Sequence, residues 1–463
     1  MVGMTHENEI RFFRFSGLYQ HDGWLMPAYV GVDDAGIIQY ISSDPPAPGV
    51  GAETVQGFAL PGFQNAHSHA FQYAMAGDAE IHPPGMNDDF WTWREAMYHC
   101  ALSVNPAQAE AIAAMLYAEM LRNGYTHVAE FHYLHHDKDG KPYSNLSEMG
   151  ERMLSAAKTA GIRITLVPVF YQRGGFGQPP AERQRRFISK TTDEFLKLLT
   201  ESVKACDYYS MANGGFSVHS LRAVNGDDVK RAFHEGPKGL PFHLHVSEQK
   251  KEVADCLAYT GKRPMQWLLS NLPVDENFHL VHSTHLDDTE LKELAASKAN
   301  VVLCPSTEGN LGDGIFRMKE YTRMGGKWCI GTDSHIGLDP LEEFRMIDYR
   351  QRLVTNLRST FEGNATGYLL NTAQKQGRLA MGLTGRNYFE VGAPFDTVVY
   401  NARSPRLATA ERKNLLAVLL YHGNSSMAVG TIVNGKWVVK NQKHVAFESI
   451  RQPFVKAMKE INS

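Results

Sequence analysis

The sequence predicts a (β/α)8 barrel joined to a small β-sandwich domain that is built from both ends of the chain. From residue 58 onward, short apolar runs alternate with longer segments that carry apolar residues at helical spacing. This alternation is typical of parallel βα units, and the chain holds eight such runs. The two ends show only strand and turn signals. We therefore place the barrel over residues 58–389 and the small domain over 1–57 and 390–463.

The terminal segments predict hairpins. Residues 29–32 and 37–41 are apolar runs that flank a turn ending in Gly36. Near the other end, residues 396–400 are strand-like, and Asn434-Gly435 separates two further short runs. Asn-Gly favours the type I′ turn that matches the twist of paired strands.

Eight apolar runs form the predicted barrel strands: residues 58–63, 125–131, 162–170, 215–218, 241–246, 278–282, 300–304 and 328–331. Helices are predicted between them, for example over 106–123, which Gly124 ends, and over 145–160, which Gly161 ends. The active site of such a barrel lies at the carboxyl ends of its strands. Functional residues are therefore expected directly after these runs.

The composition is that of an ordinary soluble protein, with 43% hydrophobic residues, 21% charged residues and a net charge of -3. Neither nucleic acid nor a membrane is expected as a partner. Charged residues occupy the start of the chain, where a signal peptide needs an apolar core. The five cysteines are scattered and form no Cys-x-x-Cys pair, which predicts reduced thiols and a cytoplasmic location.

Histidines at the end of the first predicted strand suggest a metal site. The run 58–63 leads into His67-Ser-His69, and residues two apart on an extended backbone point to the same side. The fifth strand carries His243 and His245, one of which can face the barrel mouth. His282 ends the sixth strand and Asp333 follows the eighth.

These residues predict one divalent metal per chain, held by His67, His69, His245 and Asp333. Zinc is the first choice, and Fe²⁺ and Mn²⁺ are alternatives. His282 is expected to be a further ligand or a polarising neighbour. No lysine stands at the end of strand 215–218, so a carboxylated lysine bridging two metals is not expected.

A metal at this place would activate water to hydroxide near neutral pH. Asp333 can touch both the metal and the water, which makes it the expected general base. Glu248 lies just beyond the fifth strand and is placed to carry a proton to a leaving nitrogen. Arg222 directly follows the fourth strand, and Arg94 lies in an aromatic stretch that could hold a loop over the site. Arginines are natural partners for carboxylates.

The chain resembles the amidohydrolase superfamily, in its single-metal aminohydrolase branch, along almost its whole length. Within that branch it is most similar to the formimidoylglutamate deiminases. The motifs that carry the resemblance are His67-Ser-His-Ala-Phe-Gln72, Phe90-Trp-Thr-Trp-Arg94, Ala129-Glu-Phe-His-Tyr133, His135-His-Asp137, His219-Ser-Leu-Arg222, Glu308-Gly-Asn-Leu-Gly-Asp-Gly-Ile315 and Gly331-Thr-Asp-Ser-His335.

This resemblance implies a fold of the amidohydrolase type and zinc on the four residues named above. It implies catalytic roles for Glu248, His282 and Asp333. It also implies that the substrate carboxylates are bound by Gln72, Arg94, Tyr133, His219 and Arg222. The implied reaction converts N-formimino-L-glutamate, a small dicarboxylate from histidine degradation, to N-formyl-L-glutamate and ammonia, in a homodimer.

Two positions depart from the family pattern: Tyr73 stands where arginine is usual, and Gly309 where alanine is usual. Neither is a predicted site residue, but both bear on substrate preference. Two other functions are open. One is a single-metal aminohydrolase that acts on a heterocyclic amine, and the other is a non-catalytic paralogue.

Overall fold

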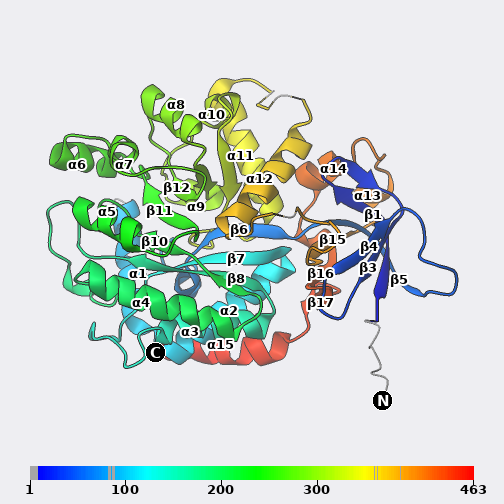
Figure 1. The fold of residues 1–463 in the computed structure, drawn as a ribbon, viewed down its shortest axis with the longest axis horizontal. Coiled ribbons are helices and arrows are strands. Elements are labelled where there is room, and N and C mark those ends of the chain that lie inside the picture. The colour runs from blue at the N-terminus through cyan, green and yellow to red at the C-terminus, as the bar shows by residue number, and fades with distance from the viewer. Residues whose placement is uncertain (1–8, 82–84, 86–88, 359, 362, 386) are drawn as a thin grey trace, which may run out of the picture.

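The structure, a computed structural model, describes residues 9–81, 85, 89–358, 360–361, 363–385 and 387–463. It contains a parallel barrel and a separate sheet formed by the two ends of the chain, which lies to the right of the barrel in Figure 1. Both parts of the predicted fold are therefore confirmed. The predicted domain boundaries at residues 57 and 390 stay a prediction.

The sheet from the chain ends has nine strands in the order β18-β17-β16-β15-β5-β1-β3-β4, with β2 paired to β1. Its members are β1 (Arg11–Gln20), β2 (Gly23–Leu25), β3 (Ala28–Val32), β4 (Ile38–Ser42), β5 (Ala52–Pro61), β15 (Thr397–Asn401), β16 (Ala428–Val433), β17 (Lys436–Lys440) and β18 (Lys443–His444). Both predicted hairpins are present as antiparallel pairs, β3 with β4 and β16 with β17. Asn434 and Gly435 both have positive φ, as a type I′ turn requires.

The barrel strands follow the order β6-β7-β8-β10-β11-β12-β13-β14, all parallel, with β9 (Ala212–Gly214) paired to β8. They are β6 (Phe63–Ser68), β7 (Tyr125–His132), β8 (Arg163–Phe170), β10 (Phe216–Val218), β11 (Phe242–Val246), β12 (Phe278–His282), β13 (Asn300–Leu303) and β14 (Lys327–Ile330). A parallel bridge between Ser68 and Asp333 closes the ring between the first and last strands.

One predicted strand is wrong. The run 58–63 is not the first barrel strand, because β5 ends at Pro61 inside the terminal sheet, paired with β1 and β15. The barrel begins at β6, on the far side of Gly62. His67 therefore lies within a barrel strand rather than beyond its end.

Helices surround the barrel strands. They are α1 (Phe90–Ser103), α2 (Pro106–Arg122), α3 (Glu148–Ala160), α4 (Thr192–Ala205), α5 (Gly226–Glu235), α6 (Lys250–Thr260), α7 (Pro264–Asn271), α8 (Asp288–Ser297), α9 (Pro305–Asn310), α10 (Met318–Arg323), α11 (Pro340–Thr355), α12 (Ala365–Ala380), α13 (Pro405–Ala408), α14 (Leu415–His422) and α15 (Phe447–Ile461). Short 3-10 turns are η1 (Ala70–Met75), η2 (Glu182–Gln184), η3 (Cys206–Tyr208) and η4 (Ser425–Met427).

The predicted helix over 106–123 is α2, which begins with an Asn105 cap and Pro106 and ends at Arg122. The predicted helix over 145–160 is α3, which Gly161 ends in the left-handed conformation. α2 is buried on most sides because the C-terminal helix α15, red in Figure 1, packs along it.

All five cysteines are free and buried, which confirms the prediction of unpaired thiols. Among the described residues, no helix combines the length and the apolar character needed to cross a membrane.

Candidate metal centre and substrate pocket

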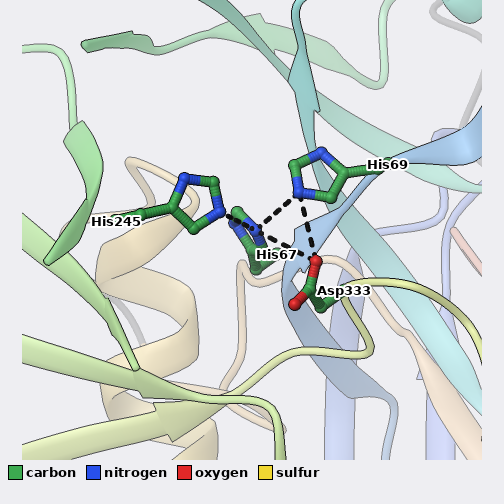
Figure 2. Close-up of side chains that lie close together, drawn as sticks. All are labelled: His67, His69, His245 and Asp333. Carbon is green, nitrogen blue, oxygen red and sulfur yellow. Dashed lines mark hydrogen bonds and ion pairs between the residues drawn. The ribbon is translucent and has the colours of Figure 1, made fainter. Parts of the chain in front are cut away.

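Three histidines and one aspartate converge at the carboxyl ends of the barrel strands (Figure 2). The Nε2 atom of His67 lies 3.0 Å from the Nε2 atoms of both His69 and His245. Asp333 Oδ1 lies 3.1 Å from His69 Nε2 and 3.6 Å from His67 Nε2. All four side chains are buried. The structure therefore brings together the whole predicted ligand set.

The hydrogen bonds of the imidazole rings show what this cluster can hold. His69 Nδ1 lies 3.0 Å from the Phe131 carbonyl, and His245 Nδ1 lies 3.0 Å from the His219 carbonyl. A carbonyl accepts only from a protonated nitrogen, so neutral rings here turn their Nε2 lone pairs toward the centre. Burial chiefly lowers the pKa of His67 and of His245, and the neighbouring histidines lower both further. Converging lone pairs of neutral imidazoles repel one another unless a cation lies between them, so the site fits a metal ion.

Asp333 completes the cluster as a carboxylate. Burial alone would raise the pKa of its carboxyl group, but the bond to His69 and the charges of His67, His69 and His282 lower it below the ordinary value. The residue adopts a left-handed backbone with φ of 48°, and His282 does so with φ of 67°. Such strained conformations at strand ends turn side chains toward the centre of a site.

Gly331 is required where the barrel closes. A Cβ atom at this position would lie 2.7 Å from His67 Cβ and 2.9 Å from the His67 nitrogen. The last strand can approach the first only because this residue has no side chain. The Asp333 amide can then donate to the His67 carbonyl at 3.0 Å, which places Asp333 beside the histidines.

Glu130 holds the segment that links the first two histidines. Its carboxylate accepts from Ser68 Oγ at 2.7 Å, from the Ala70 amide at 2.6 Å and from the Tyr117 hydroxyl at 3.1 Å. Burial raises the pKa of Glu130 to about 7, although these bonds oppose the rise. No role was predicted for Glu130. An acidic residue inside the predicted strand 125–131 was the sequence signal for it.

Glu248 and His282 adjoin the metal cluster. His282 Nε2 lies 3.7 Å from Glu248 Oε1 and 3.6 Å from Asp333 Oδ2, so it stands between the two carboxylates. Burial alone would lower the pKa of His282, but Glu248, Glu308 and Asp333 raise it to about 10. His282 lies outside the cluster of His67, His69, His245 and Asp333, but with Cys304 and Asp333 it forms a second group of ligand atoms within 4.8 Å of one another, so both predicted roles for it stay open.

A chain of ionic contacts supports His282 from behind. Its Nδ1 lies 3.5 Å from Glu308 Oε1, and that oxygen also accepts from the Cys304 amide at 2.9 Å. The other Glu308 oxygen pairs with Arg350 at 2.9 Å. Glu308 lies in one of the motifs that carry the resemblance, but no role was predicted for it.

A pocket adjoins this centre, and it is lined by residues of the metal cluster together with aromatic and charged side chains. All five predicted substrate residues line it: Gln72, Arg94, Tyr133, His219 and Arg222. The side-chain Nε2 atom of Gln72 donates to the Tyr133 hydroxyl at 2.9 Å, and the side-chain Oε1 atom of Gln72 has no hydrogen-bond partner among the described residues. Burial, followed by Arg222 and His69, lowers the pKa of His219, so its ring is neutral.

Arg94 and Arg222 present guanidinium groups to the pocket. Arg222 is 7% exposed, and its Nε and Nη1 atoms are buried with no hydrogen-bond partner in the described part of the chain. Its Nη2 atom lies 3.6 Å from Glu248 Oε2, so it also forms an ion pair. Arg94 stacks over Trp91 at 4.5 Å and also has an unpartnered, buried Nε atom. No described carboxylate pairs with Arg94.

The aromatic stretch around Arg94 forms the first turns of the helix α1. In α1, Phe90, Trp93, Arg94, Met97 and Tyr98 all line the pocket. Their spacing of three and four residues places them on one helical face. That periodicity was the signal in the sequence for Met97 and Tyr98, for which no role was predicted. Tyr171 and Leu311 also line the pocket. Leu311 lies in one of the motifs that carry the resemblance, whereas Tyr171 had no signal of its own.

The two departures from the family pattern lie outside the pocket lining. Tyr73 packs against Phe454 of α15, with ring centroids 5.8 Å apart. Gly309 lies in α9, where a Cβ atom would come within 2.9 Å of Arg350 Nη2. An alanine there would press on the arginine that pairs with Glu308.

Comparisons with known proteins agree with this architecture. The sequence profile described as Amidohydrolase family matches residues 58–438. The formimidoylglutamate deiminase of Pseudomonas aeruginosa is 41% identical over 447 residues, which cover 95% of this chain and 97% of that protein. A crystal structure of an amidohydrolase from Brucella melitensis superposes with a TM-score of 0.91 at 39% identity, covering 98% of this chain and 100% of that one. An adenosine deaminase from Xanthomonas campestris with bound zinc shares the fold, with a TM-score of 0.82, 21% identity and coverage of 97% and 98%.

Proposed function

The chain belongs to the amidohydrolase family, and on that premise we propose that it hydrolyses N-formimino-L-glutamate to N-formyl-L-glutamate and ammonia. The relative that is 41% identical over 95% of the chain is named for this deimination. Every residue that the resemblance implies for the substrate lies in one pocket beside the candidate metal centre.

The observation that carries the proposal is the pair of arginines with unsatisfied donors. Buried guanidinium nitrogens without partners are costly, so a ligand that supplies acceptors is favoured at this place. Arg94 and Arg222 line the same pocket, which suits a substrate with two carboxylates. A neutral ring amine would leave the unsatisfied donors of both guanidinium groups without acceptors.

We propose that His67, His69, His245 and Asp333 hold one zinc ion. A set of neutral imidazoles with one carboxylate suits zinc, although Fe²⁺ and Mn²⁺ also accept such ligands. A divalent cation at this place supplies Lewis acidity and activates a water molecule.

The residues of the chain then perform the other tasks. Arg94, Arg222, Gln72, Tyr133 and His219 bind and orient the substrate so that its formimino carbon faces the attacking water. Asp333 accepts the proton of that water. Glu248 delivers a proton to the terminal nitrogen, while His282, between the two carboxylates, polarises the reacting carbon.

The bond changes balance. Oxygen from water bonds to the formimino carbon, and the bond from that carbon to its terminal nitrogen breaks. The nitrogen leaves as ammonia with the protons that Glu248 and the water supply, and the formyl group stays on the glutamate nitrogen. We place this reaction in histidine degradation, in the cytoplasm and in a homodimer, as the family resemblance implies.

An ammonia-release assay tests the proposal. The purified, metal-loaded chain should release ammonia from N-formimino-L-glutamate and much less from guanine, cytosine or adenosine. Activity on a ring amine without activity on N-formimino-L-glutamate would instead favour a heterocyclic aminohydrolase. A chain that binds no metal and turns over none of these compounds would favour a non-catalytic paralogue.

A further inference from the structure

Two tyrosines with no predicted role form part of the pocket wall. Tyr98 lies in α1, and Tyr171 directly follows β8. Their hydroxyl groups are joined by Gln184, from the short turn η2, whose Nε2 atom lies 2.8 Å from Tyr98 Oη and 2.9 Å from Tyr171 Oη. All three side chains are at least 95% buried. A single amide therefore connects the helix that carries Arg94 to the loop after β8.

The orientation of this amide follows from its other bond. Gln184 Oε1 accepts from the Ala181 amide at 2.8 Å, and a backbone N–H can donate only to the oxygen. The NH2 group must therefore face the tyrosines. Its two protons are both used, one for each hydroxyl oxygen.

Each tyrosine oxygen thus accepts a hydrogen bond, and its own proton points elsewhere. No carbonyl or carboxylate of the described chain accepts from either hydroxyl group. A hydrogen bond between the two hydroxyl groups, in either direction, would use only one of the two protons. One tyrosine O–H is left over in a buried position at the pocket wall.

The surroundings of Tyr171 indicate which proton this is. Its ring lies 4.6 Å from the His219 ring, between centroids, which places it among the predicted substrate residues. Burial chiefly raises the pKa of Tyr171 and the Tyr98 hydroxyl adds to this, whereas Arg94 and Arg222 oppose the rise. Arg94 and Arg222 line the same pocket as Tyr171, so a carboxylate that pairs with these arginines would share the pocket with the Tyr171 hydroxyl group.

We propose that Tyr171 is a specificity-determining residue that donates its hydroxyl proton to one of the substrate carboxylates, beside Arg94 and Arg222. Gln184 is a positioning residue: its Nε2 atom donates to the Tyr171 oxygen, so the Tyr171 proton must point elsewhere. The inference rests on the proposed dicarboxylate substrate.

The test replaces the hydroxyl group and varies the carboxylates. Tyr171→Phe is assayed on N-formimino-L-glutamate, on N-formimino-L-norvaline, which lacks the side-chain carboxylate, and on N-formimino-γ-aminobutyrate, which lacks the α-carboxylate. A hydrogen bond to a charged group predicts a loss of about 10- to 150-fold in kcat/KM on the dicarboxylate. The loss should persist on one monoacid and vanish on the other, which identifies the carboxylate that Tyr171 contacts.

Two further variants separate positioning from general structure. Tyr98→Phe should lose less than Tyr171→Phe on the dicarboxylate, because it keeps the hydroxyl group that is proposed to donate to the substrate. Tyr209→Phe is the matched control, since Tyr209 is buried and donates to the Ile162 carbonyl at 2.9 Å outside the pocket lining. It should change thermal stability without changing the preference among the three substrates.

The inference is wrong if Tyr171→Phe leaves kcat/KM on the dicarboxylate unchanged, or if it lowers activity on all three compounds by the same factor. A larger loss in Tyr98→Phe than in Tyr171→Phe would also overturn the assignment. These outcomes differ from failure of the proposed function. In that case the unaltered chain itself would not release ammonia from N-formimino-L-glutamate.

Discussion

Replacement of Arg222 by methionine separates two roles that the structure gives to this residue. Methionine keeps much of the side-chain volume and removes the charge. Two guanidinium nitrogens are buried and unpartnered, so they are available to the substrate, whereas the third lies 3.6 Å from the Glu248 carboxylate. The kcat/KM of the variant should therefore fall for two reasons. One loss depends on the substrate carboxylate, and the other is the same for all substrates.

The first loss follows from burial. Removing one partner of a buried, hydrogen-bonded charge pair costs about 2–5 kcal/mol. At about 1.4 kcal/mol for each tenfold change, kcat/KM on N-formimino-L-glutamate should fall by roughly 30- to 4000-fold. The second loss reflects Glu248, which would stand buried without its cation. A buried carboxylate that loses its partner destabilises the fold by up to about 3–5 kcal/mol, so thermal stability should fall as well.

Arg94→Met is the matched control, because no described carboxylate pairs with Arg94. Its kcat/KM should show the loss that depends on the substrate carboxylate but not the loss that is the same for all substrates. Its melting temperature should stay closer to that of the unaltered chain. The assay measures ammonia release from the dicarboxylate and from the norvaline and γ-aminobutyrate analogues. Each arginine variant should lose much less on the analogue that lacks its own carboxylate.

A uniform loss across all three compounds in both variants would refute this reasoning. It would mean that the arginines shape the pocket and do not bind carboxylates. The main physical reason for an acidic substrate would then be gone, and only the resemblance would support it.

Three other predictions follow from the metal centre and the core. A chelator should abolish turnover and one equivalent of zinc should restore it, and elemental analysis that finds about two ions per chain would contradict the single site. Asp333→Asn should lower kcat by about 100- to 10,000-fold through loss of the base, with metal content measured alongside; near-normal turnover of a fully metallated variant would show that another group takes the proton. Burial raises the pKa of Glu343 to about 8 from 4.5, so between these values the folded chain holds a proton that the unfolded chain releases, and the free energy of unfolding falls as pH rises. Glu343→Gln should therefore lose less thermal stability than the unaltered chain between about pH 5 and about pH 8, and an identical pH profile would contradict the shift.

The barrel could be predicted because its strands are buried on both faces and therefore appear as continuous apolar runs. Residues 278–282 illustrate this, since the predicted and observed bounds of β12 are the same. The first strand could not be placed in the same way. Residues 58–63 are one apolar run, but its first part pairs with β1 and β15, and Phe63 pairs with β7. The residues of an apolar run do not indicate which of the two sheets contains the strands that pair with it.

The candidate metal ligands could be predicted because parallel strands bring their carboxyl ends to one place. His245 was chosen because it lies at the predicted end of its strand, and the Nε2 atom of His243 instead lies 2.9 Å from the Ala380 carbonyl. Tyr171 could not be predicted, because its position depends on Gln184 and on how the loop after β8 meets α1. Such contacts join segments that are far apart in the chain, and no spacing rule describes them.

The distribution of charge explains how one pocket could reject most amines that reach it. At the hydrolytic end, His282 lies beside the carboxylates of Glu248, Glu308 and Asp333. At the other end, Glu252 and Glu248 act on Arg222, but two of its nitrogens have no acceptor among the described residues, and Arg94 pairs with no described carboxylate. A substrate without carboxylates would displace water from these guanidinium groups and would not supply a hydrogen-bond acceptor to replace it. A site that is built to bind a polar group rejects analogues that lack it far more strongly than it rejects analogues of a slightly different size. The guanidinium nitrogens without acceptors therefore disfavour neutral ring amines and favour a dicarboxylate. This discrimination does not depend on the identity of the metal.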